Sequence, residues 1–306
     1  MIPAPFKPHE PIRGVAVDQG SGLAAAIAAA RGADARDDDL ETFKRIVVET
    51  ASPVATTLLV DSTYGAHLLP LMAPPCIPML AFEADVYHIA DEDRITRLPD
   101  NLTVEQFPTL GAPVLKFFLY YGPNDPAELN QRKFDLVRSI GDRCRAQGTT
   151  FLFEPIVYDR AVSDGASKEY ALLKPELVRR AVEDFVDPDY KIDILKIEIP
   201  VTLEFVEGFG TPAMSRRDAE AAIVDVSNAA GDMPFVYLSA GVTYERFVEG
   251  LKFCKSSSGK AAGYMCGRAL WSDAIGIFGS EGANAMARWM ETTGRDRLAG
   301  MNEAIA

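Results

Sequence analysis

Residues 192–200 read Ile-Asp-Ile-Leu-Lys-Ile-Glu-Ile-Pro, and the alternation in this run indicates a strand of a closed sheet. Successive side chains of a β-strand point to opposite faces. From residue 194 onward, one face of this run is apolar, with Leu195, Ile197 and Ile199. The other face carries Lys196 and Glu198. Because the apolar face is expected to pack against helices, we expect the two charged side chains to point into a barrel.

Seven further runs of apolar or β-branched residues accompany this one along the chain. The eight predicted strands are residues 15–19, 56–61, 76–83, 114–121, 150–157, 192–200, 234–240 and 262–269. The segments between them carry helix signals, which is the pattern of β-α units that form a parallel sheet.

Three of the intervening helices have recognisable ends. Residues 124–147 place apolar side chains at helical spacing and stop at Gly148. Residues 174–185 are predicted to form a helix with Pro175 in its first turn. Residues 215–230 begin with Ser215 and Asp218, a variant of the capping box, and end before Gly231.

Eight strands separated by helices favour a TIM barrel over a doubly wound sheet. The first strand runs into Asp-Gln-Gly-Ser-Gly at residues 18–22, which lacks the glycine pattern of a dinucleotide-binding turn. We therefore predict one (β/α)8 domain over residues 1–306, with a short N-terminal extension at 1–14 and C-terminal helices at about 280–306. The Ser/Gly run at 256–259 is too short for a linker.

Composition excludes several classes of protein. The 306 residues include 44 acidic and 31 basic side chains, for a net charge of −13, without a cluster of Lys and Arg. This balance excludes nucleic acid and anionic membrane surfaces as partners, so an anionic ligand must meet a few local cations. The four cysteines are far apart in the sequence, which indicates reduced thiols in a cytoplasmic protein.

Membrane insertion and secretion are not expected either. The sequence has no run of 18 apolar residues that could cross a bilayer. The apolar run at 23–30 follows Asp18 and a proline-rich start instead of a short basic segment, unlike a signal peptide.

Charged residues of several predicted strands converge on the barrel interior. The same alternation that places Lys196 and Glu198 inside also places Lys116 and Glu154 there, and Asp18 lies at the carboxyl end of the first strand. A structural ion-pair network is one explanation. Because burying such a network carries a large desolvation cost, a catalytic role explains these buried charges better. Burial and a neighbouring like charge lower the pKa of a lysine, so we expect a lysine nucleophile that forms a Schiff base with a carbonyl.

Other catalytic chemistries have weaker support. The chain has three histidines, and although His67 and His88 could follow strands, no pair has metal-ligand spacing. We predict no metal site. Ser239 is not part of a G-x-S-x-G nucleophile elbow.

The last two strands end in small residues and one cation. Residues 238–242 read Leu-Ser-Ala-Gly-Val and residues 266–269 read Cys-Gly-Arg-Ala. In this fold the loops after strands seven and eight often bind phosphate through backbone amides and a cation. Tight turns with Arg268 in a salt bridge are the structural alternative.

Taken in order, these blocks resemble the class I tagatose 1,6-bisphosphate aldolases over nearly the whole chain. The blocks are residues 15–19, 115–121, 153–155, 194–200, 205–208, 237–242 and 266–269. The resemblance implies a Schiff base between Lys196 and the C2 carbonyl of a ketose. It implies Glu154 as the general acid and base at the C4 hydroxyl, with Lys116 and Asp18 in support.

The resemblance also implies the residues that bind the substrate. Ser239, Gly241, Gly267 and Arg268 would hold the C1 phosphate, with Gln19 nearby, and Glu198 is counted among the substrate-binding residues. The implied reaction is reversible cleavage to dihydroxyacetone phosphate and an aldehyde, glyceraldehyde 3-phosphate in the case of tagatose 1,6-bisphosphate. No cofactor is implied, the partner is a phosphorylated sugar, and a homo-oligomer is compatible with the sequence.

One position departs from the family pattern. The family has an arginine directly after the glutamine of the first block, where this chain has Gly20. The resemblance therefore supports the C1 phosphate more firmly than a C6 phosphate. A related branch that cleaves 6-deoxy-6-sulfofructose 1-phosphate to sulfolactaldehyde is the alternative substrate class. A sugar-phosphate-binding regulator without turnover and a metal-dependent class II aldolase are further alternatives.

Overall fold

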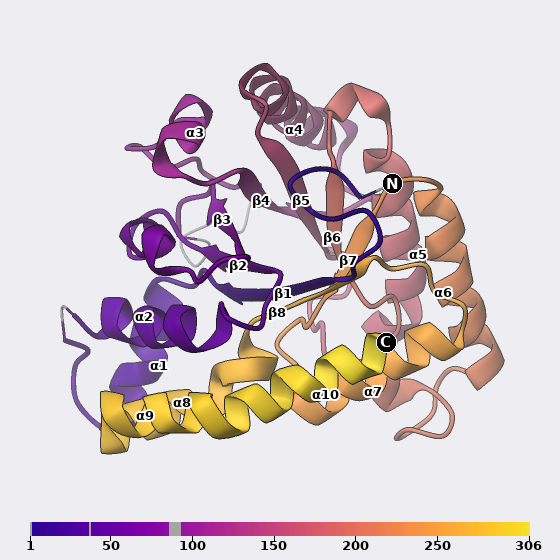
Figure 1. Cartoon of the computed structure of the whole chain (residues 1–306). Helices are drawn as coiled ribbons and strands as arrows, with labels where there is room; N and C mark the ends of the chain where they lie inside the picture. The colour runs from indigo at the N-terminus through magenta and orange to yellow at the C-terminus, as the bar shows by residue number, and fades with distance from the viewer. Residues whose placement is uncertain (1, 37, 86–92) are drawn as a thin grey trace.

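The chain was analysed as a computed structural model that describes residues 2–36, 38–85 and 93–306. Within these residues, eight parallel strands follow one another around a closed barrel (Figure 1). β1 pairs with both β2 and β8, which closes the sheet. The predicted (β/α)8 barrel is confirmed. The strands are β1 (Ile12–Val17), β2 (Thr57–Val60), β3 (Ile77–Ala81), β4 (Val114–Tyr121), β5 (Thr150–Val157), β6 (Ile194–Glu198), β7 (Phe235–Leu238) and β8 (Gly263–Cys266).

Every predicted strand overlaps an observed one, and β4 and β5 match at both ends. The predicted limits were wrong at the first and last strands. β1 begins at Ile12 within the predicted extension and ends at Val17, so Asp18 follows the strand. β8 ends at Cys266, because the helical backbone begins at Arg268 directly after Gly267. Ala269, Leu270 and Trp271 beyond this junction are as apolar as the strand, so hydropathy does not mark where the strand ends.

Helices surround the barrel (Figure 1), and α8, α9 and α10 run along one edge. The α-helices are α1 (Ser21–Arg31), α2 (Asp39–Ala51), α3 (Phe107–Leu110), α4 (Ala127–Gln147), α5 (Lys168–Phe185), α6 (Arg216–Ala230), α7 (Tyr244–Ser256), α8 (Arg268–Glu281), α9 (Ala283–Trp289) and α10 (Arg295–Ile305). Shorter helical segments are η1 (Ala66–Leu71), η3 (Val104–Gln106), η4 (Pro188–Tyr190), η5 (Leu203–Phe205) and η6 (Met290–Gly294).

The predicted helix ends were right at α6 and wrong at α5. Ser215 caps α6, and its hydroxyl accepts a hydrogen bond from the backbone N–H of Asp218. α5 begins at Lys168, after the cap Ser167, so Pro175 lies inside the helix and not in its first turn. A proline within a helix removes one backbone hydrogen bond, which the buried face of α5 compensates by packing against the barrel.

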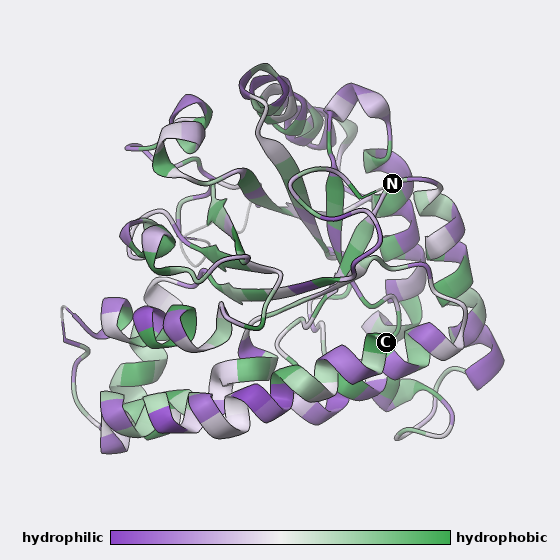
Figure 2. Cartoon of the chain, viewed as in Figure 1, coloured by the Kyte–Doolittle hydropathy of each residue, from purple (hydrophilic) through white to green (hydrophobic). Residues whose placement is uncertain are grey.

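Two hydrophobic cores lie on the two faces of the sheet. The outer core, between strands and helices, includes Leu195 and Ile197 of β6. The inner core, inside the barrel, includes Ile194 of the same strand, together with Val114 of β4 and Leu152 of β5. Figure 2 shows the strands largely green and the helices green and purple in turn. Lys196, Lys116 and Glu154 have the parity of the inner core, so the predicted orientation of these side chains is confirmed.

The N-terminal segment closes the barrel at the amino ends of its strands. Phe6 is buried in the inner core with Ile12 at the start of β1. The hydroxyl of Thr150, at the start of β5, donates a hydrogen bond to the Ala4 carbonyl. Access to the barrel interior is therefore from the carboxyl ends of the strands.

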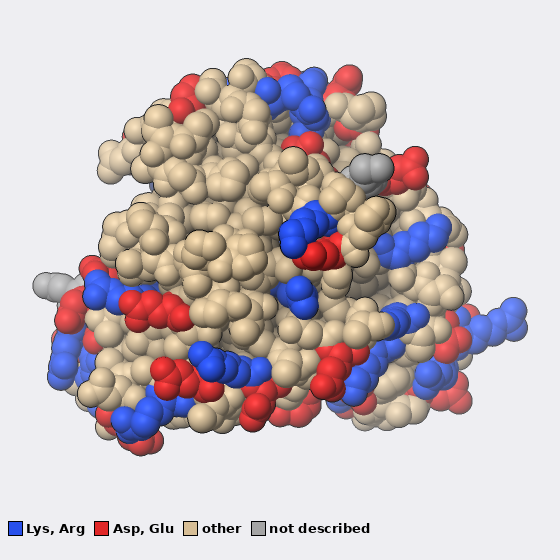
Figure 3. Space-filling view, viewed as in Figure 1, with Lys and Arg blue, Asp and Glu red and all other residues tan. Residues whose placement is uncertain are grey.

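The surface shown in Figure 3 carries interspersed acidic and basic side chains along the edge where α9 and α10 lie. Among the described residues, no helix combines the length and apolar character that crossing a bilayer requires.

Candidate active site

Charged side chains gather inside the barrel at the carboxyl ends of five strands. Lys116 comes from β4, Glu154 from β5 and Lys196 from β6, and each is at most 6% exposed. Asp18 directly follows β1, and Glu83 lies two residues beyond β3. The inner core beneath them is apolar. Charges buried at this depth require partners, and they find them in one another.

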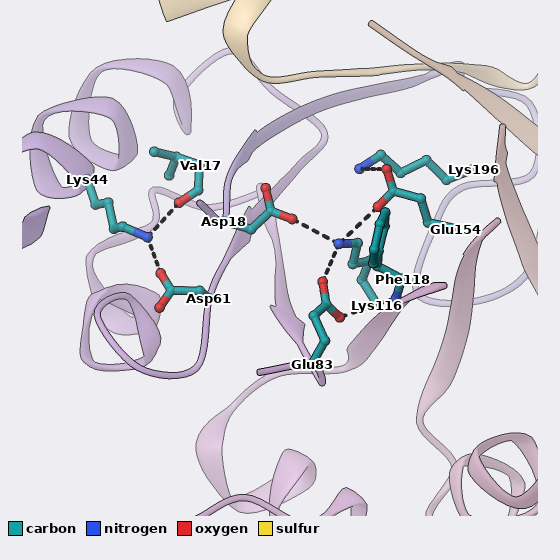
Figure 4. Close-up of polar contacts among 9 residues, drawn as sticks. All are labelled: Val17, Asp18, Lys44, Asp61, Glu83, Lys116, Phe118, Glu154 and Lys196. Carbon is teal, nitrogen blue, oxygen red and sulfur yellow. Dashed lines mark hydrogen bonds and ion pairs between the residues drawn. The ribbon is translucent and has the colours of Figure 1, made fainter. Parts of the chain in front are cut away.

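Lys116 is the centre of this cluster (Figure 4). Its Nζ lies 2.9 Å from Asp18 Oδ2 and 2.9 Å from Glu154 Oε2, and it also donates a hydrogen bond to Glu83. The backbone N–H of Phe118 donates to the other Glu83 oxygen at 3.3 Å. One ammonium group is thus held by three carboxylates from three strands.

Glu154 bridges the two lysines. Its Oε1 lies 2.9 Å from Lys196 Nζ, and its Oε2 lies 2.9 Å from Lys116 Nζ. Both contacts are ion pairs without hydrogen-bond alignment, and Oε2 is buried without a hydrogen-bond partner. The carboxylate can therefore still accept a proton or a hydrogen bond from a molecule in the barrel.

The charges around Lys116 keep its side chain protonated. Burial alone would lower the pKa of Lys116, but Asp18, Glu154 and Glu83 raise it well above its usual value. Burial would raise the pKa of Asp18, but attraction to Lys116 and Lys196 lowers it well below its usual range. Lys116 is thus a permanent cation, because three carboxylates outweigh burial and one neighbouring lysine.

Glu83 behaves differently from Asp18. Burial raises its pKa to about 7, the attraction of Lys116 opposes this, and the charges of Asp18 and Glu154 add to it. Glu83 was missed in the sequence, although a signal existed. It has the parity of Ala81, an inner-core residue of β3, so the alternation test applied to residues 76–83 places it inside the barrel.

The raised pKa of Glu83 predicts a specific pH dependence of stability. Since the folded protein binds this proton more tightly than the unfolded chain, the contribution is full below pH 4.5 and is lost as the pH rises through about 7. Glu83→Gln removes the contribution. As the pH rises from 4.5 to 8, the unfolding free energy of the variant minus that of the parent should therefore increase by about 3 kcal/mol. Urea denaturation across this pH range measures it, and parallel curves for the two proteins would contradict it.

A second buried lysine supports the carboxyl ends of β1 and β2. Lys44 of α2 is fully buried, donates a hydrogen bond to the Val17 carbonyl at 3.1 Å and pairs with Asp61 (Figure 4). Asp61 in turn accepts hydrogen bonds from the backbone N–H groups of Thr63 and Tyr64. This network fixes the backbone immediately before Asp18. Sequence reasoning missed Lys44, because it lies on a helix and not on a strand.

A cavity of about 470 Å³ opens above the charged cluster. Its walls include all ten residues predicted for the site: Lys196, Glu154, Lys116, Asp18, Gln19, Glu198, Ser239, Gly241, Gly267 and Arg268. The structure thus brings every predicted site residue to one place. Glu198 also pairs with Lys174 of α5 at 3.0 Å and accepts a hydrogen bond from the Val157 N–H.

The wall formed after β7 and β8 carries an exposed arginine. The guanidinium of Arg268 packs against Gly241, where an added Cβ would lie 2.6 Å from Nη2. Gly241 also has a φ of 76°, which only glycine adopts without strain. In the described part of the chain Arg268 has no hydrogen-bonding or ion-pair partner. Its N-terminal neighbour Gly267 is the N-cap of α8 and also lines the cavity.

The comparison with known proteins agrees with this site. A family model described as "DeoC/LacD family aldolase" matches residues 13–273. The chain belongs to the DeoC/LacD aldolases. It is therefore a carbon–carbon lyase, and the buried lysines lie in the barrel of an aldolase.

Other DeoC/LacD aldolases share about a third of their residues with this chain. The tagatose 1,6-diphosphate aldolase of Listeria monocytogenes is 33% identical over 296 residues, covering 96% of this chain and 87% of that protein. Tagatose 1,6-diphosphate aldolase 1 of Enterococcus faecalis is 35% identical over 297 residues, and the Lactococcus lactis enzyme is 34% identical over 298. Each of these two matches covers 96% of this chain and 90% of the relative.

A solved structure of an aldolase has the same fold. Fructose-bisphosphate aldolase from Plasmodium falciparum, in complex with TRAP and a small-molecule inhibitor, superposes with a TM-score of 0.71. The match covers 96% of this chain and 90% of that chain, at 13% sequence identity. At this identity the similarity extends to the barrel alone.

The remaining sequence predictions concern histidines and cysteines. His67 is exposed and lies 3.3 Å from Glu41 Oε1 on the surface, and His88 lies outside the described residues. No group of three or more His, Cys, Asp or Glu side chains in the described ranges could hold a metal ion. All four cysteines are free and buried, as predicted for reduced thiols.

Proposed function

We propose that this DeoC/LacD aldolase cleaves a ketose 1-phosphate through a Schiff base on Lys196. The observation that carries the proposal is the pairing of Lys196 with Glu154, at 2.9 Å, on the floor of a cavity. The rim of this cavity holds Arg268, which has no ion-pair partner among the residues that the structure describes. A nucleophilic amine, a proton acceptor and an anion-binding cation are the groups that this reaction needs.

The first half of the reaction joins the substrate to Lys196. Glu154 takes the ammonium proton, and the free amine attacks the C2 carbonyl of the ketose. The resulting carbinolamine loses its hydroxyl as water, with the proton returned by Glu154, and a cationic imine forms. The pairing of Lys196 Nζ with Glu154 Oε1 provides a direct route for this proton.

The second half breaks the bond between C3 and C4. Glu154 removes the proton of the C4 hydroxyl, the electron pair of the C3–C4 bond moves to the imine, and an aldehyde leaves. The enamine that remains is protonated at C3 and hydrolysed to dihydroxyacetone phosphate and free Lys196. Oε2 of Glu154, which is ion-paired with Lys116 but accepts no hydrogen bond, is the atom proposed to accept the hydroxyl proton.

Lys116 and Asp18 support these steps without reacting. Because Lys116 remains an ammonium group, it holds Glu154 in place and can donate hydrogen bonds to substrate hydroxyls. Asp18, held as a carboxylate, can accept hydrogen bonds from them. In this proposal Gln19 and Glu198 contact the sugar from the cavity walls.

The phosphate is proposed to bind between the loops after β7 and β8. Arg268 supplies the charge, and Ser239, Gly241 and Gly267 supply backbone N–H groups and a hydroxyl on the same wall. Tagatose 1,6-bisphosphate, named for the relatives, is the reference substrate of the proposal. The products would be dihydroxyacetone phosphate and glyceraldehyde 3-phosphate.

Reductive trapping tests the mechanism directly. Borohydride added with dihydroxyacetone phosphate should reduce the imine and leave a stable adduct, which peptide mass mapping should locate on Lys196. The proposed mechanism needs no metal, so turnover should be unchanged by EDTA. An adduct on Lys116, or none at all, would refute the mechanism.

Replacement of Glu154 should separate bond cleavage from Schiff-base formation. Glu154→Gln keeps the shape of the side chain but removes the proton acceptor, so we expect kcat for cleavage to fall by about 10²- to 10⁴-fold. Borohydride should still trap the adduct on Lys196, although more slowly. The rate of cleavage and the rate of adduct formation on Lys196, measured in samples quenched at timed intervals, show whether the two steps respond differently. Equal loss of cleavage and trapping would assign Glu154 to imine formation only.

A further inference from the structure

We propose that Arg94 binds the second phosphate of a ketose bisphosphate at the rim of the cavity, on the side opposite Arg268. The inference rests on the proposed function, in which Arg268 binds the C1 phosphate and Lys196 and Glu154 act on C2 to C4. It adds where the far end of the substrate lies and which cation recognises it. The group recognised is a terminal phosphate, which the proposed mechanism leaves on the aldehyde product.

The order of the strands places Arg94 across the barrel mouth from Arg268. In a closed barrel of eight strands, the end of β4 faces the end of β8, which is four strands away. Arg268 follows β8, whereas Tyr120, at the end of β4, lines the cavity and contacts the Arg94 guanidinium. A ketose 1,6-bisphosphate has its two phosphates at opposite ends of the carbon chain. The cations that bind them are therefore expected on opposite sides of the mouth, as these two are.

Two tyrosine rings hold the Arg94 guanidinium at this rim. Its central carbon lies 4.2 Å from the ring centroid of Tyr158, which directly follows β5, and 5.4 Å from that of Tyr120. Arginine stacks on aromatic rings through the face of its guanidinium, while the N–H donors point outward in the plane of the group. A guanidinium held in this way presents the bidentate edge that binds phosphate.

The segment that carries Arg94 has contacts on both sides that place it at the cavity wall. Before it, Asp93 pairs with Arg132 of α4 at 3.2 Å. After it, the Arg97 carbonyl accepts a hydrogen bond at 2.8 Å from the backbone N–H of Ala84, which itself lines the cavity. Arg94 therefore lies between a cavity wall formed after β3 and the ring of a cavity residue at the end of β4.

Three basic residues, Arg94, Lys133 and Arg160, gather around the ring of Tyr158. Lys133 is fully buried and donates hydrogen bonds to Asp125 at 3.0 Å and to the Tyr158 hydroxyl at 3.1 Å. Arg160 pairs with the same carboxylate at 2.6 Å. Burial lowers the pKa of Lys133, and the charges of Arg160 and Arg94 lower it further, although Asp125 opposes them. The charges of the three basic residues favour an anion on this side of the mouth.

The N-terminus of α1, beside the first strand, is closed to the second phosphate. Helix N-termini attract anions, and here a carboxylate of the protein takes that place. Asp85 Oδ2 accepts a hydrogen bond from the backbone N–H of Ser21 at 2.6 Å. An added Cβ on Gly20 would lie 2.8 Å from the same oxygen, so position 20 has no room for a longer side chain. The second phosphate is therefore expected on the side of Arg94.

Retro-aldol turnover of a matched substrate pair tests the inference. Arg94→Met keeps an unbranched side chain against the rings and removes the guanidinium. We expect kcat/KM for tagatose 1,6-bisphosphate, divided by that for tagatose 1-phosphate, to fall about 10- to 100-fold, the loss for one charge-assisted contact. Arg94→Lys keeps the charge without the planar fork, so its ratio should fall less. Initial rates with the two substrates measure the ratio, which partial misfolding leaves unchanged because it lowers both rates together.

The condensation direction locates the effect at one end of the substrate. Arg94→Met should raise KM for glyceraldehyde 3-phosphate about tenfold or more, because this aldehyde carries the phosphate that Arg94 is proposed to bind. KM for dihydroxyacetone phosphate should change far less, because its phosphate binds at Arg268. A loss confined to dihydroxyacetone phosphate would overturn the inference.

Arg138→Met is the matched control. Arg138 of α4 also lies over a tyrosine ring, that of Tyr190 at 5.1 Å, and neither residue lines the cavity. Its ratio should equal that of the parent. An unchanged ratio in Arg94→Met, or an equal fall in Arg138→Met, would overturn the inference while the borohydride adduct on Lys196 still forms, since dihydroxyacetone phosphate lacks the second phosphate. Absence of the adduct in the parent enzyme would instead overturn the proposed function.

Discussion

Replacing Lys196 by methionine should reduce cleavage by at least about 10⁴-fold and abolish the borohydride adduct. The amine is the group proposed to become covalently attached to the substrate, and loss of a nucleophile removes the whole covalent route. Substrate should still bind, because the proposed phosphate site at Arg268 is untouched. Initial-rate assays, adduct mass and direct binding of dihydroxyacetone phosphate measure the three effects.

Two further variants show whether the amine or its charge matters. Lys196→Arg keeps the positive charge beside Glu154 but cannot form a Schiff base, so it should be as inactive as Lys196→Met. Lys191→Met removes a half-buried lysine that pairs with Asp142 at the protein surface and should retain full turnover. Activity in Lys196→Arg would show that the charge alone suffices and would refute the covalent mechanism.

Replacing Lys116 by methionine should damage both stability and catalysis. The substitution leaves Asp18, Glu83 and Glu154 buried around an apolar side chain. Removal of one partner from a buried ion pair costs about 3–5 kcal/mol, so the free energy of unfolding at neutral pH should fall by that amount. Glu154 would also lose the cation that holds it, and kcat should fall by about 10²-fold or more. Urea denaturation and initial rates measure the two losses.

A second substitution distinguishes electrostatics from packing. Adding Glu83→Gln to Lys116→Met removes one of the uncompensated carboxylates, so part of the lost stability should return. Acidification should also narrow the gap between Lys116→Met and the parent, since the carboxylates become protonated. No recovery in either case would show that methionine fails for steric reasons.

Local sequence patterns were sufficient to predict where the strands lie and which of their side chains point into the barrel. Alternation in β4, β5 and β6 placed Lys116, Glu154 and Lys196 on the inner face, because the side-chain period of a strand does not depend on the rest of the fold. Helix limits were less predictable. Pro175 suggested the start of a helix, but the packing of α5 against the barrel overrides that local preference.

Contacts between distant segments could not be predicted in this way. Asp85 meets Ser21 across 64 residues, and Lys116 meets Asp18 across 98. Alternation placed Glu154 inside the barrel with Lys116, but nothing in the sequence near Lys116 shows that Asp18, Glu83 and Glu154 will all contact its ammonium group. The pairing of Lys44 with Asp61 is another such contact, since it joins a helix to the end of a strand.

The periodicity of the sequence thus determined the barrel and the set of residues that face its interior, because both follow from rules that act within a few residues. The pairing of those residues was decided only when eight strands closed into a barrel and brought their carboxyl ends together. Pairing sets which lysine remains charged, which carboxylate can take a proton and which helix N-terminus is already occupied. Electrostatic interactions act through space, and the distances that control them exist only in the folded chain.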